Sequence, residues 1–385
     1  MIVGILKETF PSEHRVAIVP DVGATLQDKD VALVIETGAG IASGFSDAAY
    51  EARDFEVVAE RAAILERSDV LLQVRTPGAN PVAGEADLAY LKAGQVLIGM
   101  AEPLMAHTTT EAVARLGVVL FGMELIPRIT RAQSMDVLSS MATVAGYKAS
   151  LLAANELPKM FPLMMTASGT ITPARVLVIG AGVAGLQAIA TCRRLGAVVQ
   201  AYDVRSAVKE QVESLGADFV DLALDTDEAE DAGGYARVQD DAFYDRQRDA
   251  LAQVVSANDV VITTAAIPGQ TSPLLITEDA VRSMASGSVI IDLAAERGGN
   301  CALTRADEIV VESNVKIFGP TNLPATAPYH ASQMYANNLS HFLELIIDAG
   351  QIKVDMEDEI VRETLVARNG AVVNERVKEA MDNEN

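Results

Sequence analysis

Residues 180–185 read Gly180-Ala181-Gly182-Val183-Ala184-Gly185, and they decide the fold of the second half of the chain. The apolar run 175–179 before them has the length of a buried strand, and residues 186–192 after them have helical character. A strand, a G-x-G-x-x-G turn and a helix open a dinucleotide-binding domain. The first glycine allows the tight turn, the second lets a pyrophosphate approach the backbone, and the third lets helix and strand pack closely.

Asp203 ends a second predicted strand, residues 198–202, at about the twenty-residue spacing that a ribose-binding carboxylate requires. A carboxylate at this position accepts a hydrogen bond from a ribose 2′-hydroxyl and repels a 2′-phosphate. The turn and Asp203 therefore predict a site for NAD(H) rather than NADP(H). Arg205, two residues after Asp203, complicates this prediction, because its guanidinium could bind the 2′-phosphate of NADP(H).

The composition predicts a folded chain that does not insert into a membrane. Its 385 residues are enough for two domains, half of them are hydrophobic, and the mean hydropathy is +0.21. We find no uninterrupted apolar run of spanning length and no signal-peptide pattern at the start. Cys192 and Cys301 give neither a disulfide framework nor a metal cluster, so we expect a reducing cytoplasm and no metal.

The charge excludes a nucleic-acid partner. The 53 acidic and 30 basic residues give a net charge of −23, which repels nucleic acid and anionic lipid. Of the basic residues, 9 are lysine and 21 are arginine. An acidic, lysine-poor chain suggests a salty cytoplasm that screens self-repulsion; the alternative is an ordinary acidic enzyme.

Strand and helix patterns alternate along the chain, which predicts an α/β fold. We expect two Rossmann-like, doubly wound parallel-sheet domains separated by a cleft. Candidate strands in the first half are 2–5, 31–35, 70–74, 96–98 and 118–121; those in the second half are 176–179, 198–202, 218–220, 260–264, 289–292 and 315–318. The expected domains are residues 1–136 with 328–385, the N-terminal α/β domain completed by the C-terminal helix, and residues 137–327, the NAD(H)-binding domain.

An acidic insertion, residues 221–241, contains Gly233, Gly234 and Tyr235. A connection of this length within a compact domain is typical of a lid or docking loop, and a surface loop without a function is the alternative.

The chain supplies a nucleotide site but no evident acid–base apparatus. None of its four histidines, His14, His107, His330 and His341, stands in a sequence pattern that pairs a general base with a residue that orients it. No Cys/His/carboxylate spacing suggests a metal. We therefore expect a hydride carrier whose redox partner is another nucleotide, because such a transfer needs proximity and orientation but no proton transfer.

Two N-terminal segments, Gly4-Ile5-Leu6-Lys7-Glu8 and residues 13–20, resemble a signature shared by two kinds of protein. These are alanine dehydrogenases and the NAD(H)-binding subunit of proton-translocating NAD(P) transhydrogenase. The resemblance continues through residues 180–203, 263–269, 291–301 and 321–324, so it covers nearly the whole chain.

Three departures argue against an amino-acid dehydrogenase. Alanine dehydrogenases carry a catalytic histidine where residues 94–103, which include Glu102, have none. Arg75 stands in the place of their substrate lysine, and Glu296 in the place of their catalytic aspartate. Arg15 is retained, but it belongs to the part that both kinds of protein share.

Residues 127–140 resemble a loop peculiar to the transhydrogenase subunit. The resemblance implies that Arg128, Gln133, Asp136 and Ser139 position the dihydronicotinamide for hydride transfer. Residues 233–236 match that family's mobile loop, which folds over bound nucleotide. The implied cofactor-binding residues are Gly180, Gly182, Val183, Ala184, Gly185, Asp203, Val204, Tyr235, Thr264, Ala265 and Ala266.

The resemblance implies that NADH passes hydride to NADP⁺ on a separate beta subunit, coupled to proton translocation through a membrane-spanning subunit. The chain would be a homodimer, cytoplasmic and docked peripherally on the inner membrane through its partner. An alanine dehydrogenase and a non-catalytic NAD-binding regulatory protein are the alternatives.

Overall fold

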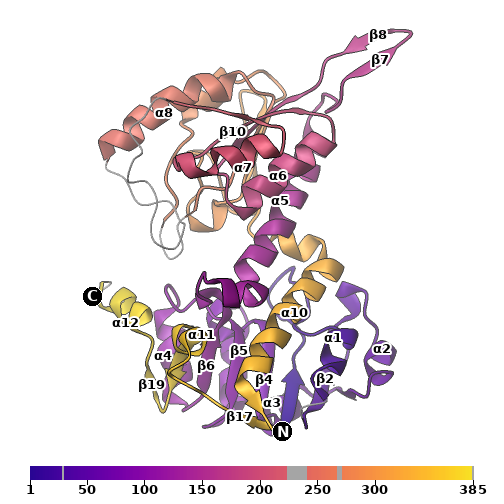
Figure 1. The fold of residues 1–385 in the computed structure, drawn as a ribbon, viewed down its shortest axis with the longest axis vertical. Coiled ribbons are helices and arrows are strands. Elements are labelled where there is room, and N and C mark those ends of the chain that lie inside the picture. The colour runs from indigo at the N-terminus through magenta and orange to yellow at the C-terminus, as the bar shows by residue number, and fades with distance from the viewer. Residues whose placement is uncertain (28–29, 223–240, 267–270, 384–385) are drawn as a thin grey trace. The chain divides into compact units, whose positions relative to one another are not determined.

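The computed structural model describes residues 1–27, 30–222, 241–266 and 271–383 (Figure 1). The chain forms two compact units. Unit 1 comprises Met1–Met141 with Pro324–Asn385, and unit 2 comprises Ala142–Leu323. The C-terminal segment therefore belongs to the same unit as the N-terminus.

Unit 1 contains a sheet of eight strands in the order β19-β18-β6-β5-β4-β1-β2-β3. The first six strands in sequence are parallel to one another and have the doubly wound order 3-2-1-4-5-6 when read from β3. Two short C-terminal strands add an antiparallel edge beside β6. The strands are β1 (Ile2–Ile5), β2 (Ala32–Glu36), β3 (Glu56–Val58), β4 (Val70–Arg75), β5 (Val96–Met100), β6 (Val119–Gly122), β18 (Leu365–Arg368) and β19 (Ala371–Val372).

The long helix α10 (Pro328–Ile346) returns to unit 1 and packs with an apolar face in its core. Phe342 of α10 meets Phe121 of β6 edge to face, with ring centroids 5.2 Å apart. A short antiparallel pair, β16 (Ile347–Asp348) and β17 (Gln351–Ile352), follows α10. The other helices of this unit are α1 (Pro20–Ala24), α2 (Asp47–Glu51), α3 (Arg61–Arg67), α4 (His107–Arg115), α11 (Glu359–Thr364) and α12 (Glu375–Asn383).

Unit 2 contains a sheet of seven strands in the order β11-β10-β9-β12-β13-β15-β14. Six strands are parallel and again follow the order 3-2-1-4-5-6, while β14 runs antiparallel to β15. The strands are β9 (Arg175–Ile179), β10 (Val198–Tyr202), β11 (Asp218–Phe219), β12 (Val260–Thr263), β13 (Val289–Asp292), β14 (Ile309–Glu312) and β15 (Val315–Phe318). The helices are α6 (Val183–Arg194), α7 (Lys209–Ser214), α8 (Asp241–Ser256) and α9 (Glu278–Ser283), together with most of α5 (Val137–Glu156), within which the boundary of the units falls.

Both faces of the unit 2 sheet are covered, as a parallel sheet requires. Val176 and Val178 of β9 join one apolar cluster, and Leu177 and Ile179 join the other. Cys192 belongs to the first cluster and Cys301 to the second, both as free thiols. Burial raises the pKa of each thiol to about 11.

A separate hairpin of β7 (Met164–Thr166) and β8 (Gly169–Ile171) extends away from the rest of unit 2 (Figure 1). Met165, the middle residue of β7, is 82% exposed. Within the described residues, only α5 is long and apolar enough to cross a membrane. Its Ala149 and Ala153 are buried in the core of unit 2, which gives a helix of this composition a place inside the fold.

The α/β prediction with doubly wound parallel sheets is confirmed. Each of the eleven predicted strands has a counterpart in the structure. The strands β3, β14, β16, β17, β18 and β19 and the β7–β8 hairpin were not predicted from the sequence.

Candidate functional site

The glycine turn lies at the carboxyl end of β9, beside the point where the strand order of unit 2 reverses between β9 and β12. Gly180 has φ +94°, a conformation that glycine adopts at little cost. A Cβ on Gly185 would lie 1.8 Å from the carbonyl oxygen of Gly180, whereas a Cβ on Gly182 would meet nothing within 4 Å. The turn is thus closed where it packs on itself and open at Gly182, which fits a pyrophosphate at the start of α6.

Val183 and Ala184 form the first turn of α6. Val183 is exposed and Ala184 partly buried, and the turn carries no acidic side chain. The first turn of α6 is therefore suited to bind an anion, because the first backbone N–H groups of a helix have no hydrogen-bond partner within the helix.

The loop after β12 is tied to the glycine turn. The Thr264 hydroxyl donates to the Gly180 carbonyl at 2.9 Å. The Ala265 N–H donates to Oδ1 of Asn300 at 3.1 Å, and Nδ2 of Asn300 donates to the Ala265 carbonyl at 2.8 Å. Nδ2 also donates to the carbonyl of Pro273 at 2.9 Å. Asn300 therefore fixes both polar groups of Ala265, while Ala266 is exposed.

We call the bonds from Asn300 to Ala265 and Pro273 the Asn300 clamp. Asp292, at the end of β13, is fully buried and holds the backbone of Asn300 in place. Its Oδ2 accepts the N–H groups of Asn300 and Cys301 and the hydroxyl of Thr304, at 2.7, 3.0 and 2.6 Å. Its Oδ1 accepts the Thr263 hydroxyl at 2.9 Å. Neither Asp292 nor Asn300 was predicted from the sequence; a carboxylate ending a buried apolar strand was the available signal.

Asp203 follows β10 and is 8% exposed. Its Oδ2 accepts the N–H of Ala181 in the glycine turn at 2.7 Å, so it lies beside the predicted phosphate position. The carboxylate also pairs with Arg205, whose Nη2 lies 2.8 Å from Oδ2. The two residues that the sequence suggested as opposing determinants of nucleotide choice are thus bound to each other, with the partly buried Val204 between them in sequence.

The four candidate nicotinamide residues lie on the segment that leads into α5 and in the first turn of that helix. Arg128 and Gln133 are exposed, while Asp136 and Ser139 are partly buried. Asp136 and Ser139 are brought together, because the Ser139 N–H and hydroxyl both donate to the Asp136 carboxylate. The 3₁₀ helix Thr130–Met135 before them is fastened to α10, where Asn338 Nδ2 donates to the Ser134 carbonyl at 2.7 Å.

The predicted lid lies outside the described residues. This applies to Tyr235, Gly233 and Gly234.

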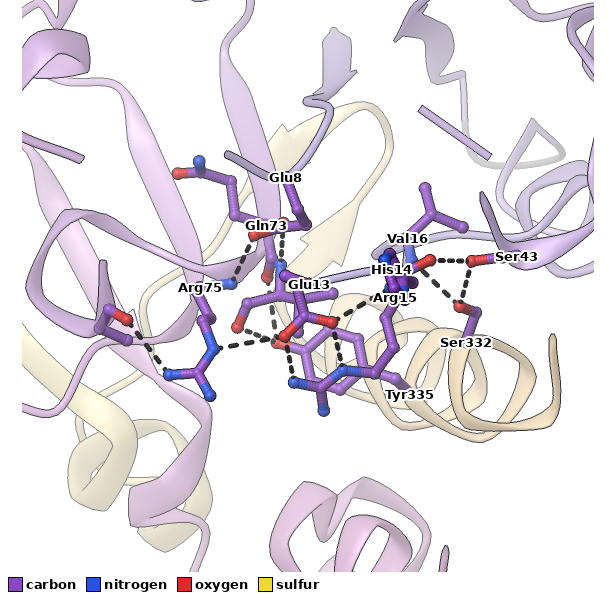
Figure 2. Close-up of polar contacts among 12 residues, drawn as sticks. Glu8, Glu13, His14, Arg15, Val16, Ser43, Gln73, Arg75, Ser332 and Tyr335 are labelled. Atoms are coloured by element: carbon purple, nitrogen blue, oxygen red, sulfur yellow. Dashed lines mark hydrogen bonds and ion pairs between the residues drawn. The ribbon is translucent and has the colours of Figure 1, made fainter. Parts of the chain in front are cut away.

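Unit 1 holds a buried charged cluster at the corresponding place in its own sheet, the carboxyl ends of the adjacent strands β1 and β4 (Figure 2). Glu8 accepts the N–H groups of Val74 and Arg75 at 2.6 and 3.2 Å. Glu13 pairs with Arg15 at 2.6 Å and with Arg75 at 3.3 Å. Glu13 therefore binds both arginine side chains, while the Glu8 carboxyl group accepts backbone N–H groups of β4.

The electrostatics of the cluster are unusual. Burial raises the pKa of Glu8 to about 8, and the nearby Glu13 carboxylate contributes to the rise. The Arg75 guanidinium carbon lies 4.3 Å from the centre of the Phe10 ring, a cation–π contact. The Tyr335 hydroxyl of α10 donates to the Gln73 carbonyl at 3.0 Å, which joins α10 to β4 (Figure 2). Of these residues, only Arg15 and Arg75 stood out in the sequence.

A second buried carboxyl group lies at the ends of β5 and β6. Glu124 Oε1 accepts the Ala101 N–H at 2.7 Å and the Glu102 N–H at 2.5 Å. Burial raises the pKa of Glu124 to about 7, and the Glu102 carboxylate adds to the rise. Glu102 has φ +48°, so the segment that carries the histidine in alanine dehydrogenases is locally strained here.

Two family models match the chain. The model described as alanine dehydrogenase/PNT, N-terminal domain, matches residues 4–145. The model described as alanine dehydrogenase/PNT, C-terminal domain, matches residues 149–375.

Individual relatives narrow this assignment. A chain of Rhodospirillum rubrum named as the first portion of NAD(P) transhydrogenase subunit alpha is 45% identical over 378 residues, covering 97% of this chain and 98% of the relative. The crystal structure of a transhydrogenase from Sinorhizobium meliloti aligns with a TM-score of 0.85 and 42% identity, covering 97% of this chain and 100% of the other. A solved L-alanine dehydrogenase aligns with a TM-score of 0.82 at 23% identity over 100% of this chain and 99% of the other, a likeness that shows the fold alone. The chain belongs to the alanine dehydrogenase/PNT family, among its NAD(P) transhydrogenase alpha subunits.

Proposed function

We propose that this chain is the NAD(H)-binding subunit of a proton-translocating transhydrogenase. It passes hydride between NADH and NADP⁺ held on a separate beta subunit, and a membrane-spanning subunit couples the transfer to proton movement. The observation that carries the proposal is the glycine turn of unit 2, open at Gly182 and bonded to Asp203, in a chain 45% identical to a transhydrogenase alpha subunit.

The bound nicotinamide supplies the hydride chemistry, and the protein contributes binding and orientation. Gly180–Gly185 and the start of α6 hold the pyrophosphate, and Asp203 and Val204 hold the adenine ribose. Thr264, Ala265 and Ala266 form the adjoining wall, which Asn300 fixes. Because these residues only bind and orient the nucleotide, the proposed hydride transfer needs no general base.

Arg128, Gln133, Asp136 and Ser139 are proposed to grip the carboxamide and ribose of the nicotinamide half. An amide, a carboxylate, a hydroxyl and a guanidinium supply donors and acceptors for that purpose. Tyr235 and its loop are proposed to close over bound nucleotide.

Reconstitution tests the proposal. The purified chain is mixed with membranes that carry the membrane-spanning and NADP(H)-binding subunits of a related enzyme, and reduction of an NADP⁺ analogue by NADH is recorded. Transfer that depends on this chain, together with its recovery in the membrane fraction, supports the reaction and a cytoplasmic, peripheral location. NADH binding without any transfer would favour a non-catalytic NAD-binding protein.

The proposal includes a homodimer. Leu163, Met165 and Ile171 on or beside the β7–β8 hairpin are 56%, 82% and 39% exposed. A two-stranded hairpin is marginally stable alone in water, so this one calls for a packing partner. An apolar groove of about 540 Å³, lined by residues such as Leu157, Phe161 and Leu195, lies at its base. Light scattering should report a dimer that Met165→Glu weakens; a monomeric wild-type chain would exclude the homodimer.

A further inference from the structure

Arg205 occupies the acceptor positions that the Asp203 carboxylate would offer to a ribose. The backbone N–H and Nε of Arg205 donate to Oδ1 at 2.8 and 2.9 Å. Nη2 of Arg205 and the N–H of Ala181 donate to Oδ2 at 2.8 and 2.7 Å. A carboxylate has about four lone-pair positions, so these four donors saturate it.

We propose that Arg205 is a specificity-determining residue, an internal latch on Asp203 that is released when the ribose of NADH binds. The inference rests on the proposed NAD(H) function and adds the bond that must break for the nucleotide to bind. It also assigns a role in nucleotide choice to a residue that the glycine fingerprint does not include.

The side chain of Arg205 is the part that can leave. The two backbone N–H groups belong to the glycine turn and to the segment before the 3₁₀ helix Ser206–Val208, so the local fold holds them. Nε and Nη2 sit on a long side chain that is 13% exposed. Their departure frees one position on each carboxylate oxygen, which matches the two neighbouring hydroxyl groups of a ribose.

The same exchange discriminates between the two nucleotides. A ribose hydroxyl is a hydrogen-bond donor, so it can replace an N–H of Arg205 on the carboxylate. The 2′-phosphate of NADP(H) is only an acceptor near neutral pH and cannot take that place. With the latch closed, the Asp203–Arg205 pair is neutral; with it open, the bare carboxylate repels a phosphate.

Nucleotide titration of the full chain tests the latch, with Arg205→Leu as the main variant. Because a closed latch reduces the fraction of competent sites, its removal should tighten NADH binding by about 3- to 10-fold. NADPH binding should stay weak or weaken further, so the preference for NADH should widen. Arg282→Leu is the matched control, since Arg282 is an ion-paired arginine of the same unit whose partners are Glu278, Asp279 and Glu312.

Stopped-flow kinetics give a readout that a structural role would not move. The observed rate of NADH binding should level off with concentration in the wild type, where the latch must first open, and rise linearly in Arg205→Leu. If the leucine variant fails to fold, Arg205→Gln provides the test, because its neutral amide group can still donate to Asp203 but carries no charge.

The outcomes separate the two proposals. A wild-type chain that binds no NADH would overturn the proposed function. Wild-type binding that Arg205→Leu weakens, or equal kinetics in both proteins, would overturn the latch alone.

Discussion

The Ser139 hydroxyl donates to one oxygen of the Asp136 carboxylate at 2.6 Å, and the Ser139 N–H donates to the other at 2.8 Å. Asp136 therefore caps α5, and Ser139 is the third residue of that helix. Two of the residues proposed to grip the nicotinamide are thus bound to each other at a helix end. A test of their role must separate helix capping from positioning.

Asp136→Asn and Asp136→Ala make that separation, because asparagine caps a helix about as well as aspartate. In urea unfolding, the alanine variant should lose about 1 kcal/mol and the asparagine variant much less. In the reconstituted complex, Asp136→Asn should nevertheless slow hydride transfer by on the order of 100-fold while NADH affinity changes little. Equal losses of affinity and rate would assign Asp136 to binding.

Two glycines of the turn should respond to alanine in opposite ways. Gly185→Ala places a Cβ 1.8 Å from the Gly180 carbonyl oxygen, so it should destabilise unit 2 and abolish NADH binding. Gly182→Ala meets open space, so the fold should stay within about 1 kcal/mol of the wild type. NADH binding should still weaken in Gly182→Ala, because the methyl group obstructs the pyrophosphate approach. Unchanged NADH affinity in that variant, measured by fluorescence titration, would place the phosphates elsewhere.

Asn300→Ala should make the loop around Ala265, which adjoins the proposed nucleotide site, less rigid. The substitution leaves the N–H and carbonyl of Ala265 and the carbonyl of Pro273 without their partner. Losing partners in a buried network costs about 1–3 kcal/mol, and NADH affinity should fall with it. Asn155→Ala, at an exposed position on α5, is the control and should be nearly neutral in urea unfolding and NADH titration. If both alanine variants bind NADH like the wild type, the clamp has no role in the site.

The stability of unit 1 should depend on pH through Glu8. Its pKa is about 8 in the folded chain and has the ordinary value of 4.5 in the unfolded chain. Between these values the folded state holds a proton that the unfolded chain has released. The contribution of Glu8 to stability is therefore complete below pH 4.5, is lost as pH rises to about 8, and is constant above.

Urea unfolding at about pH 5 and about pH 8 checks this prediction with Glu8→Gln. The wild type should lose more stability between the two pH values than the variant, with a slope of up to about 1.4 kcal/mol per pH unit. Glu85→Gln, at an exposed carboxylate, should follow the wild type. Parallel curves for wild type and Glu8→Gln would show that Glu8 is ionised in the folded chain.

The chain should not oxidise L-alanine with NAD⁺. The segment that carries the histidine in alanine dehydrogenases holds Glu102 here, and Arg75 already contacts Glu13 and the Phe10 ring. A steady-state assay over a panel of amino acids measures NADH production directly. Robust turnover on any of them would make an amino-acid dehydrogenase the better assignment.

Local patterns made most of the fold predictable. Buried parallel strands such as β9 and β12 are continuous apolar runs, and the glycine turn is a contiguous fingerprint. The edge strand β14 could not be predicted as a buried apolar strand, because half of it faces solvent, with Ile309 61% exposed. β18 joins the sheet of unit 1 by pairing with β6, a relation between distant segments that no local sequence period records.

Local patterns also indicate part of the candidate site. Gly180 and Asp203 follow from spacing, but the Asp203–Arg205 pair and the Asn300 clamp depend on how side chains turn in the folded unit. The Asn300–Ala265 bonds join residues 35 positions apart. The surroundings of Glu8 likewise include Val74 of β4 and Tyr335 of α10, which lie far away in sequence.

The only two cysteines of the chain are buried in opposite clusters of unit 2. With both thiols buried and their pKa near 11, a thiol reagent can modify them only when the surrounding structure opens. Labelling rates at Cys192 and Cys301 therefore report transient exposure of each side of this sheet, with no tag and no contribution from unit 1. If a bound nucleotide slows the labelling of one thiol more than that of the other, the difference shows which side of the unit 2 sheet the nucleotide stabilises.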